Sequence, residues 1–126
     1  MTFKRTKQRL QIMDVFQTSD IPLSAELVHQ KLSDPIINLS TVYRTIDTLM
    51  SANIISKVYL HNLAYYYFNR HDHVHYMICE DCHKMFEIAC VANHFKHVAN
   101  ENDFKMTHHD LVIYGVCQDC QKHSQP

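Results

Sequence analysis

The sequence predicts an α+β protein, with helices and a β-hairpin in its first half and a small α/β unit in its second half. Three observations support this fold class: apolar residues at helical spacing up to about residue 50, two β-rich runs up to residue 68, and many histidines and cysteines from residue 69 onward. A chain of 126 residues is long enough for two very small domains. We therefore expect domains at residues 1–68 and 69–126.

The first two helices are predicted from apolar spacing and from helix-ending signals. Leu10, Met13 and Phe16 recur at helical intervals with polar residues between them. In the segment SAELVHQKLS, Ser24 is a suitable N-cap for a second helix. Pro35 ends that helix because proline cannot continue the helical hydrogen bonding.

A third helix is predicted over the segment TVYRTIDTLMSA, with Ser40 or Thr41 as its N-cap. Val42, Ile46 and Leu49 fall on one face of this helix and should enter a core. Two strands follow, IISKVYL and AYYYFN, and the turn-like pair HN separates them. Three helices and a two-stranded hairpin are the element order of a winged helix-turn-helix.

The second half predicts strands at HVHYMIC, KMFEI and DLVIYGVC, with a helix at ACVANHFKHVANEN before the last of them. This βαβ-type unit is too small to bury a full core alone, so we expect it to dimerise.

The charge is unevenly distributed along the chain. Residues 1–70 carry eight Lys/Arg against five Asp/Glu, a net charge of +3, whereas residues 71–126 carry four against eight, a net charge of −4. A basic first half suits a polyanionic partner and an acidic second half suits cations, although a plain solvated surface explains the excess about as well. The chain has no 18-residue apolar run and no segment resembling a signal peptide, so we expect a cytoplasmic protein without a membrane partner.

The pairs Cys79-x-x-Cys82 and Cys117-x-x-Cys120 are the strongest motif. Four thiolates spaced in this way can close tetrahedrally on one zinc ion, which makes the site structural rather than catalytic. The 34 residues between the pairs must fold into a small domain. The alternative is buried free cysteines or a redox pair. Cys90 is left over, and we interpret it as a packing residue on a helix face.

Several histidines suggest a second metal site. His73 and His75 would share one face of a strand, His94 lies on the predicted helix, and His109 begins the last strand. Histidines from these three elements could converge on one metal ion. The alternative is that they are surface residues.

The segments LSAELVHQKL, INLSTVYRTIDTL, HDHVHYMICEDC and HHDLVIYGVCQDC, in this order, resemble the ferric uptake regulator superfamily of bacterial metal-dependent repressors. The resemblance covers nearly the whole chain and is closest to the zinc-sensing members. It implies a winged helix-turn-helix followed by a small α/β dimerisation domain. It also implies a structural zinc on Cys79, Cys82, Cys117 and Cys120, and a regulatory metal on His73, His75, His94 and His109.

The family's second site, at the hinge, falls here on Pro22, Val74 and Tyr76, none of which is a metal ligand. Either this site is absent, which we favour, or a one-residue shift recruits His73 and His75 with Glu87, and with His61 or His71 as a further ligand. Imidazole-only coordination suits zinc, nickel, cobalt or copper. We therefore expect zinc as both the structural and the regulatory metal, with an iron-, nickel- or peroxide-responsive regulator as the alternative.

The resemblance implies that the third helix enters the major groove of an operator, which we expect to be an AT-rich pseudo-palindrome bound by a homodimer. Two other classes fit less well. A zinc hydrolase lacks an HExxH motif and a paired carboxylate, so we expect no enzyme. A structural zinc interaction module leaves the TVYR helix unexplained. The expected DNA contacts are Ser40, Thr41, Tyr43 and Arg44 on the helix, and Lys7, Arg9 and Lys57, with Lys4 and Arg5, on phosphates.

Overall fold

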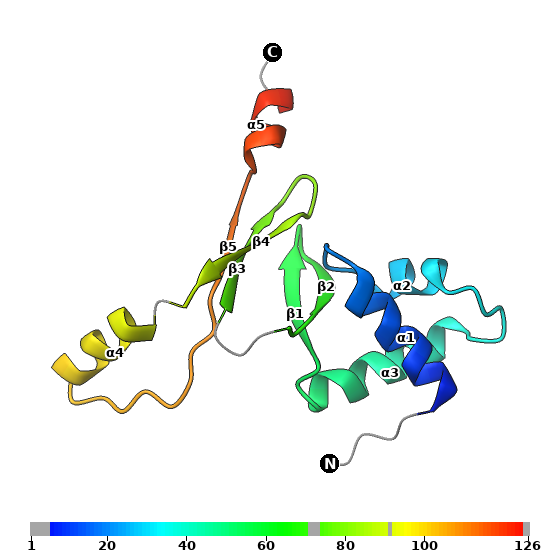
Figure 1. Ribbon diagram of the computed structural model, residues 1–126, viewed down its shortest axis with the longest axis horizontal. Helices are drawn as coiled ribbons and strands as arrows, with labels where there is room; N and C mark the ends of the chain where they lie inside the picture. The colour runs from blue at the N-terminus through cyan, green and yellow to red at the C-terminus, as the bar shows by residue number, and fades with distance from the viewer. Residues whose placement is uncertain (1–5, 71–73, 91, 125–126) are drawn as a thin grey trace. The chain divides into compact units, whose positions relative to one another are not determined.

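The structure is a computed structural model that describes residues 6–70, 74–90 and 92–124. The chain divides into two compact units, Met1–Arg70 and His71–Pro126. Both units mix helices and strands, which confirms the predicted α+β class (Figure 1).

The first unit contains three helices followed by a two-stranded hairpin, in the predicted order. Its elements are α1 (Lys7–Thr18), α2 (Ala25–Lys31), α3 (Leu39–Ser51), β1 (Ile55–Leu60) and β2 (Leu63–Phe68).

The helix starts follow side-chain caps, and one cap differs from the prediction. Ser24 caps α2 as predicted, because its hydroxyl accepts a hydrogen bond of 3.2 Å from the Leu27 N–H. Asn38, and not Ser40 or Thr41, caps α3, because its side-chain oxygen accepts a 2.9 Å hydrogen bond from the Thr41 N–H. The prediction for this cap was therefore wrong, and Ser40 and Thr41 lie in the first turn of α3.

The core of the first unit lies between the helices and the hairpin. The predicted face of α3 is confirmed, since Val42, Ile46 and Leu49 are at most 1% exposed. On α1, Phe16 and Ile12 are buried, whereas Leu10 is 42% exposed. The buried cluster comprises Ile12, Phe16, Leu23, Ala25, Val28, Ile37, Val42, Ile46, Leu49, Ile55 and Tyr66.

The hairpin turns on two residues with left-handed backbone conformations. His61 has φ 51° and Asn62 has φ 68°, and the strands pair antiparallel on either side of them. Positive φ at both central residues is the geometry of a two-residue hairpin turn that matches the twist of the strands. Leu23 exchanges two backbone hydrogen bonds of 2.8 Å with Tyr66, which joins the segment after α1 to the hairpin.

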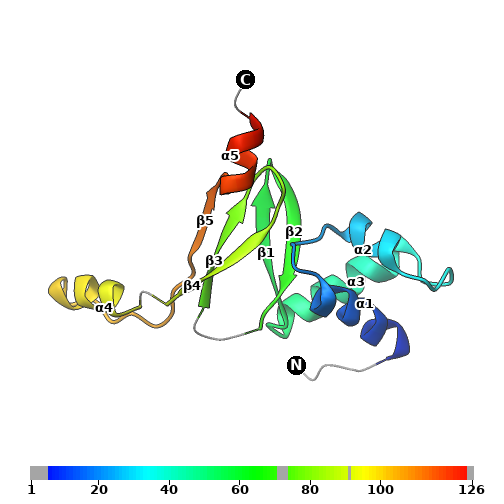
Figure 2. The ribbon, with the colours of Figure 1, turned by 45° about the horizontal axis from the view of Figure 1, so that its top comes forward.

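The second unit is a three-stranded sheet with one helix inserted before its last strand and one helix after it (Figure 2). The strand order is β4-β3-β5, with β4 antiparallel and β5 parallel to β3, as expected for a βαβ-type unit. The last helix was not predicted from the sequence. The elements are β3 (Val74–Cys79), β4 (Met85–Ala89), α4 (Ala92–Glu101), β5 (Val112–Gly115) and α5 (Gln118–Ser124).

The second unit buries little apolar surface by itself. Both views show α4 beyond the end of the sheet rather than packed across one of its faces (Figures 1 and 2). Met77 of β3 and its partner Ile113 of β5 are 39% and 44% exposed. The other exposed large apolar side chains of this unit are Phe95, Val98, Phe104, Tyr114 and Val116.

None of the helices in the described parts of the chain combines the length and the hydropathy that a membrane span requires.

Candidate metal centres and nucleic-acid interface

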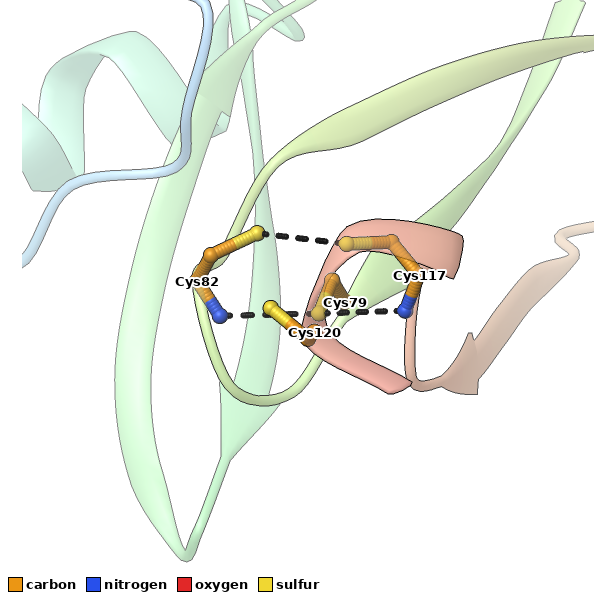
Figure 3. Close-up of side chains that lie close together, drawn as sticks. All are labelled: Cys79, Cys82, Cys117 and Cys120. Carbon is orange, nitrogen blue, oxygen red and sulfur yellow. Dashed lines mark hydrogen bonds between the residues drawn. The ribbon is translucent and has the colours of Figure 1, made fainter. Parts of the chain in front are cut away.

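Four cysteines meet at one end of the sheet of the second unit (Figure 3). Cys79 ends β3, Cys82 lies in the turn before β4, Cys117 precedes α5, and Cys120 lies within α5. Their sulfur atoms all lie within 4.8 Å of one another. We call these four residues the cysteine site.

The distance between two of the sulfur atoms matches an edge of a tetrahedral zinc site. A tetrahedron with Zn–S bonds of ~2.3 Å has S–S edges of ~3.8 Å. The Sγ atoms of Cys82 and Cys117 are 3.7 Å apart. The donor set and this spacing therefore fit a structural zinc ion, which would cross-link the β3–β4 turn to α5.

The thiols of the cysteine site differ in acidity. Burial raises the pKa of the Cys79 thiol, but hydrogen bonds from the backbone N–H groups of Cys117, Cys82 and Asp81 outweigh it and lower this pKa to about 6. A side-chain hydrogen bond with Cys117, followed by burial, raises the pKa of Cys120. Since zinc binds the thiolate form, metal binding here releases protons, most of them from the less acidic thiols.

A second group of ligand atoms lies at the other end of β3. His75, on β3, is 8% exposed, and its Nε2 atom lies 3.0 Å from the Nε2 atom of His109. Cys90, one residue beyond β4, has its Sγ atom 3.5 Å from the same His109 nitrogen. The three ligand atoms lie within 4.8 Å of one another. We call these residues the imidazole–thiol group.

The structure brings together two of the four predicted histidine ligands, His75 and His109. His94 lies on α4 and is not part of the group, although its ring is 5.6 Å from that of Phe95, which is 6.4 Å from that of His109. His73 and His71 lie outside the described residues, as do Lys4 and Arg5.

Glu87 does not join the imidazole–thiol group. Its strand partner is Tyr76, whereas His75 is paired with Ile88. Because side chains alternate along a strand, Glu87 and His75 lie on opposite faces of the sheet.

Cys90 was predicted to pack on a helix face, and this prediction was wrong. The helix begins at Ala92, so Cys90 precedes it. Cys90 lies two residues after Ile88, the partner of His75, so the register of the two strands places Cys90 on the same face as His75.

The outer face of α3 carries the predicted DNA-contacting residues. Tyr43 is 45% exposed and its hydroxyl donates a 2.5 Å hydrogen bond to the Glu26 carboxylate on α2. This hydrogen bond raises the pKa of Tyr43 and lowers that of Glu26. The contact fixes the direction of the tyrosine ring on the exposed face.

Two arginines border a polar pocket between the starts of α1 and α3. The Arg44 guanidinium donates a 3.4 Å hydrogen bond to the Thr41 hydroxyl. Lys7 lies in the first turn of α1 and Ser40 in the first turn of α3, and both are exposed. Lys57 lies on β1, with its ammonium group 5.7 Å from the centre of the Tyr59 ring. The pocket has a volume of about 230 Å³ and is lined by Thr6, Gln8, Arg9, Thr41, Arg44 and Thr45.

Comparison with known proteins identifies the family to which this fold belongs. The sequence profile described as "Ferric uptake regulator family" matches residues 1–114. The chain belongs to the ferric uptake regulator family. Members of this family are metal-responsive transcription regulators that bind DNA as dimers, and they are not enzymes.

Two ferric uptake regulation proteins and one solved structure illustrate the relationship. The protein of Bordetella parapertussis is 36% identical over 93 residues, which cover 71% of this chain and 67% of that protein. The protein of Campylobacter upsaliensis is 31% identical over 112 residues, which cover 82% and 71%. The Helicobacter pylori ferric uptake regulator, whose structure is described as having three functional metal binding sites, is 26% identical, with a TM-score of 0.81 over 98% of this chain and 85% of that chain.

Proposed function

We propose that the protein is a zinc-responsive repressor of metal-uptake genes. The observation that supports zinc is that the imidazole nitrogens of His75 and His109 lie 3.0 Å apart, with no carboxylate among the ligand residues grouped with them in the described parts of the chain. Imidazole ligands suit zinc, whereas manganese prefers oxygen ligands and many iron(II) sites combine histidines with a carboxylate.

We assign DNA binding to residues 1–68 and metal binding with dimerisation to residues 69–126. His75 and His109 hold the regulatory metal in this assignment, with His73 and His94 as further ligands. A bound zinc ion would link β3 to the segment before β5. If this linkage favours the arrangement of the units that fits an operator, metal affinity and DNA affinity rise together, because such coupling is reciprocal.

The dimer would form through the exposed apolar residues of the second unit. Met77 and Ile113 are paired across β3 and β5, and both are more than one-third exposed. Exposed apolar side chains do not stabilise a monomer, whereas their burial against a second chain provides most of the stability of an interface. A second copy of the chain is the partner that a family of dimeric regulators implies.

Zinc titration of operator binding tests the proposed function. Protein whose cysteine site is filled should bind an AT-rich pseudo-palindromic duplex upon addition of zinc, and should need a much higher concentration of iron(II) under anaerobic conditions. Fluorescence anisotropy with buffered metals measures both responses. The names of the curated relatives favour iron as the second candidate. DNA binding that responds to iron(II) and not to zinc would establish that candidate and exclude ours.

Arg44→Ala should weaken operator binding by about 1–3 kcal/mol, because this exposed guanidinium at the start of α3 can contact a base edge. Lys7→Ala is the matched comparison, since loss of a phosphate contact should weaken binding to all sequences alike. Anisotropy on operator and scrambled duplexes measures both variants. Normal operator binding by Arg44→Ala would mean that α3 is not the helix that contacts the bases.

A further inference from the structure

We propose that Cys90 is a thiolate ligand of the regulatory metal, beside His75 and His109. The inference rests on the proposed function and makes its metal site more specific. It replaces a site of histidines alone with one that contains sulfur.

Two distances within the imidazole–thiol group are close to the edges of a zinc tetrahedron. With Zn–N bonds of ~2.05 Å and Zn–S bonds of ~2.3 Å, an N–N edge measures ~3.3 Å and an N–S edge ~3.6 Å. The corresponding separations are 3.0 Å between the two Nε2 atoms and 3.5 Å between Cys90 Sγ and His109 Nε2. The agreement for the sulfur edge is as close as that within the cysteine site.

The register of the sheet explains why Cys90 reaches this place. His75 is paired with Ile88 on β4, and Cys90 follows two residues later on the same face. His109 arrives from the other side, because the segment that precedes β5 runs beside β3, with Val112 paired with Tyr76. Residues from three separate stretches of chain therefore converge on one point.

The three side chains are also poorly matched as a hydrogen-bonded cluster. The Nε2 atom of His109 carries either one hydrogen or one lone pair, so it can make one good hydrogen bond, but both His75 Nε2 and Cys90 Sγ lie close to it. All three atoms, in contrast, are good ligands for one zinc ion. His94, whose neighbour Phe95 has its ring centre 6.4 Å from that of His109, is a candidate for the fourth ligand.

Cobalt(II) spectroscopy provides the direct test, because cobalt occupies sites of the same ligand type as zinc and reports sulfur ligation. The full-length protein is prepared with one zinc per chain in the cysteine site, and one equivalent of cobalt is added. Thiolate-to-cobalt absorption in the near ultraviolet is expected for the wild type and should be absent for Cys90→Ser. Zinc analysis confirms that the cysteine site is unchanged. Bound cobalt without this absorption in the wild type, or with it in Cys90→Ser, would overturn the proposal.

Alkylation provides an independent measurement. The chain has five cysteines, so Cys90 is the one thiol outside the cysteine site. Iodoacetamide should modify Cys90 in the one-zinc protein. A second equivalent of zinc should slow this reaction at least ~10-fold, which is the size of the change in metal affinity that follows mutation of groups around a metal site. His109→Ala should abolish the protection. His97→Ala is the matched control, because its ring lies on α4, is 74% exposed and pairs with Glu101.

The outcomes separate this inference from the proposed function. If Cys90→Ser shows the wild-type zinc affinity and zinc-dependent operator binding, Cys90 is not a ligand and the proposed function stands. If the one-zinc protein binds no further metal, both are wrong.

Discussion

Replacing Cys117 with serine should release the zinc of the cysteine site and unfold the second unit, while the first unit stays folded. The second unit has few buried side chains of its own, among them Ile78 and Tyr76, whereas the first unit has a continuous core. Binding of a structural zinc contributes an apparent free energy of about 10–16 kcal/mol, which in such a unit is largely folding free energy. Zinc analysis and two-dimensional amide NMR measure the two effects.

The matched control for this prediction is Cys90→Ser. This variant removes a thiol from the same unit but leaves the cysteine site complete, so it should keep one tightly bound zinc and a folded second unit. A Cys117→Ser protein that is folded and dimeric without zinc would show that the metal does not stabilise the unit.

His109→Ala should keep the zinc of the cysteine site but lose most of the zinc-dependent DNA binding. His109 is the residue that contacts both other members of the imidazole–thiol group, so its removal disrupts every short contact in it. We expect the regulatory metal to bind at least ~10- to 100-fold more weakly, since changes beside a metal ligand already reach that size. Competition with a zinc indicator measures the metal affinity, and anisotropy with buffered zinc measures the DNA response.

Two further histidine variants complete this experiment. His94→Ala should behave like His109→Ala if His94 supplies the fourth ligand. His97→Ala should match the wild type, because this side chain is exposed. His83 is a less suitable control, since its φ of 66° makes alanine unfavourable there. Superimposable zinc responses of His109→Ala and the wild type would show that the regulatory metal binds elsewhere.

The sequence predicted best the features that depend on short-range spacing. The buried face of α3 and the HN turn follow from local periodicity and turn chemistry. The cysteine site follows from the short spacing within each Cys-x-x-Cys pair. The cap of α3 was misplaced because several neighbouring residues have suitable side chains, and only the backbone conformation selects Asn38.

Two features of the second unit required three-dimensional information. Cys90 has no partner at a recognisable spacing, and its contact with His109 arises only from the pairing of β3 with β4 and β5. The helix α5 is short and polar, with Asp119 in its first turn and Lys122 in its last, a charge distribution that suits a helix but is weak as a signal.

In the proposed two-metal arrangement, the position of the cysteine site at the end of β3 would set the order in which the metals bind. His75 lies four residues before Cys79, and His109 lies eight residues before Cys117. Without the first zinc, these histidines are joined by a loop spanning 34 residues. With it, the connecting path shortens to about 12 residues, which lowers the entropic cost of closure by about 1 kcal/mol, or about 5-fold in affinity. Once the cysteine site is filled, the effective concentration of His109 near His75 therefore rises. In a cell short of zinc, the regulatory site would empty first, while the fold that holds it remains.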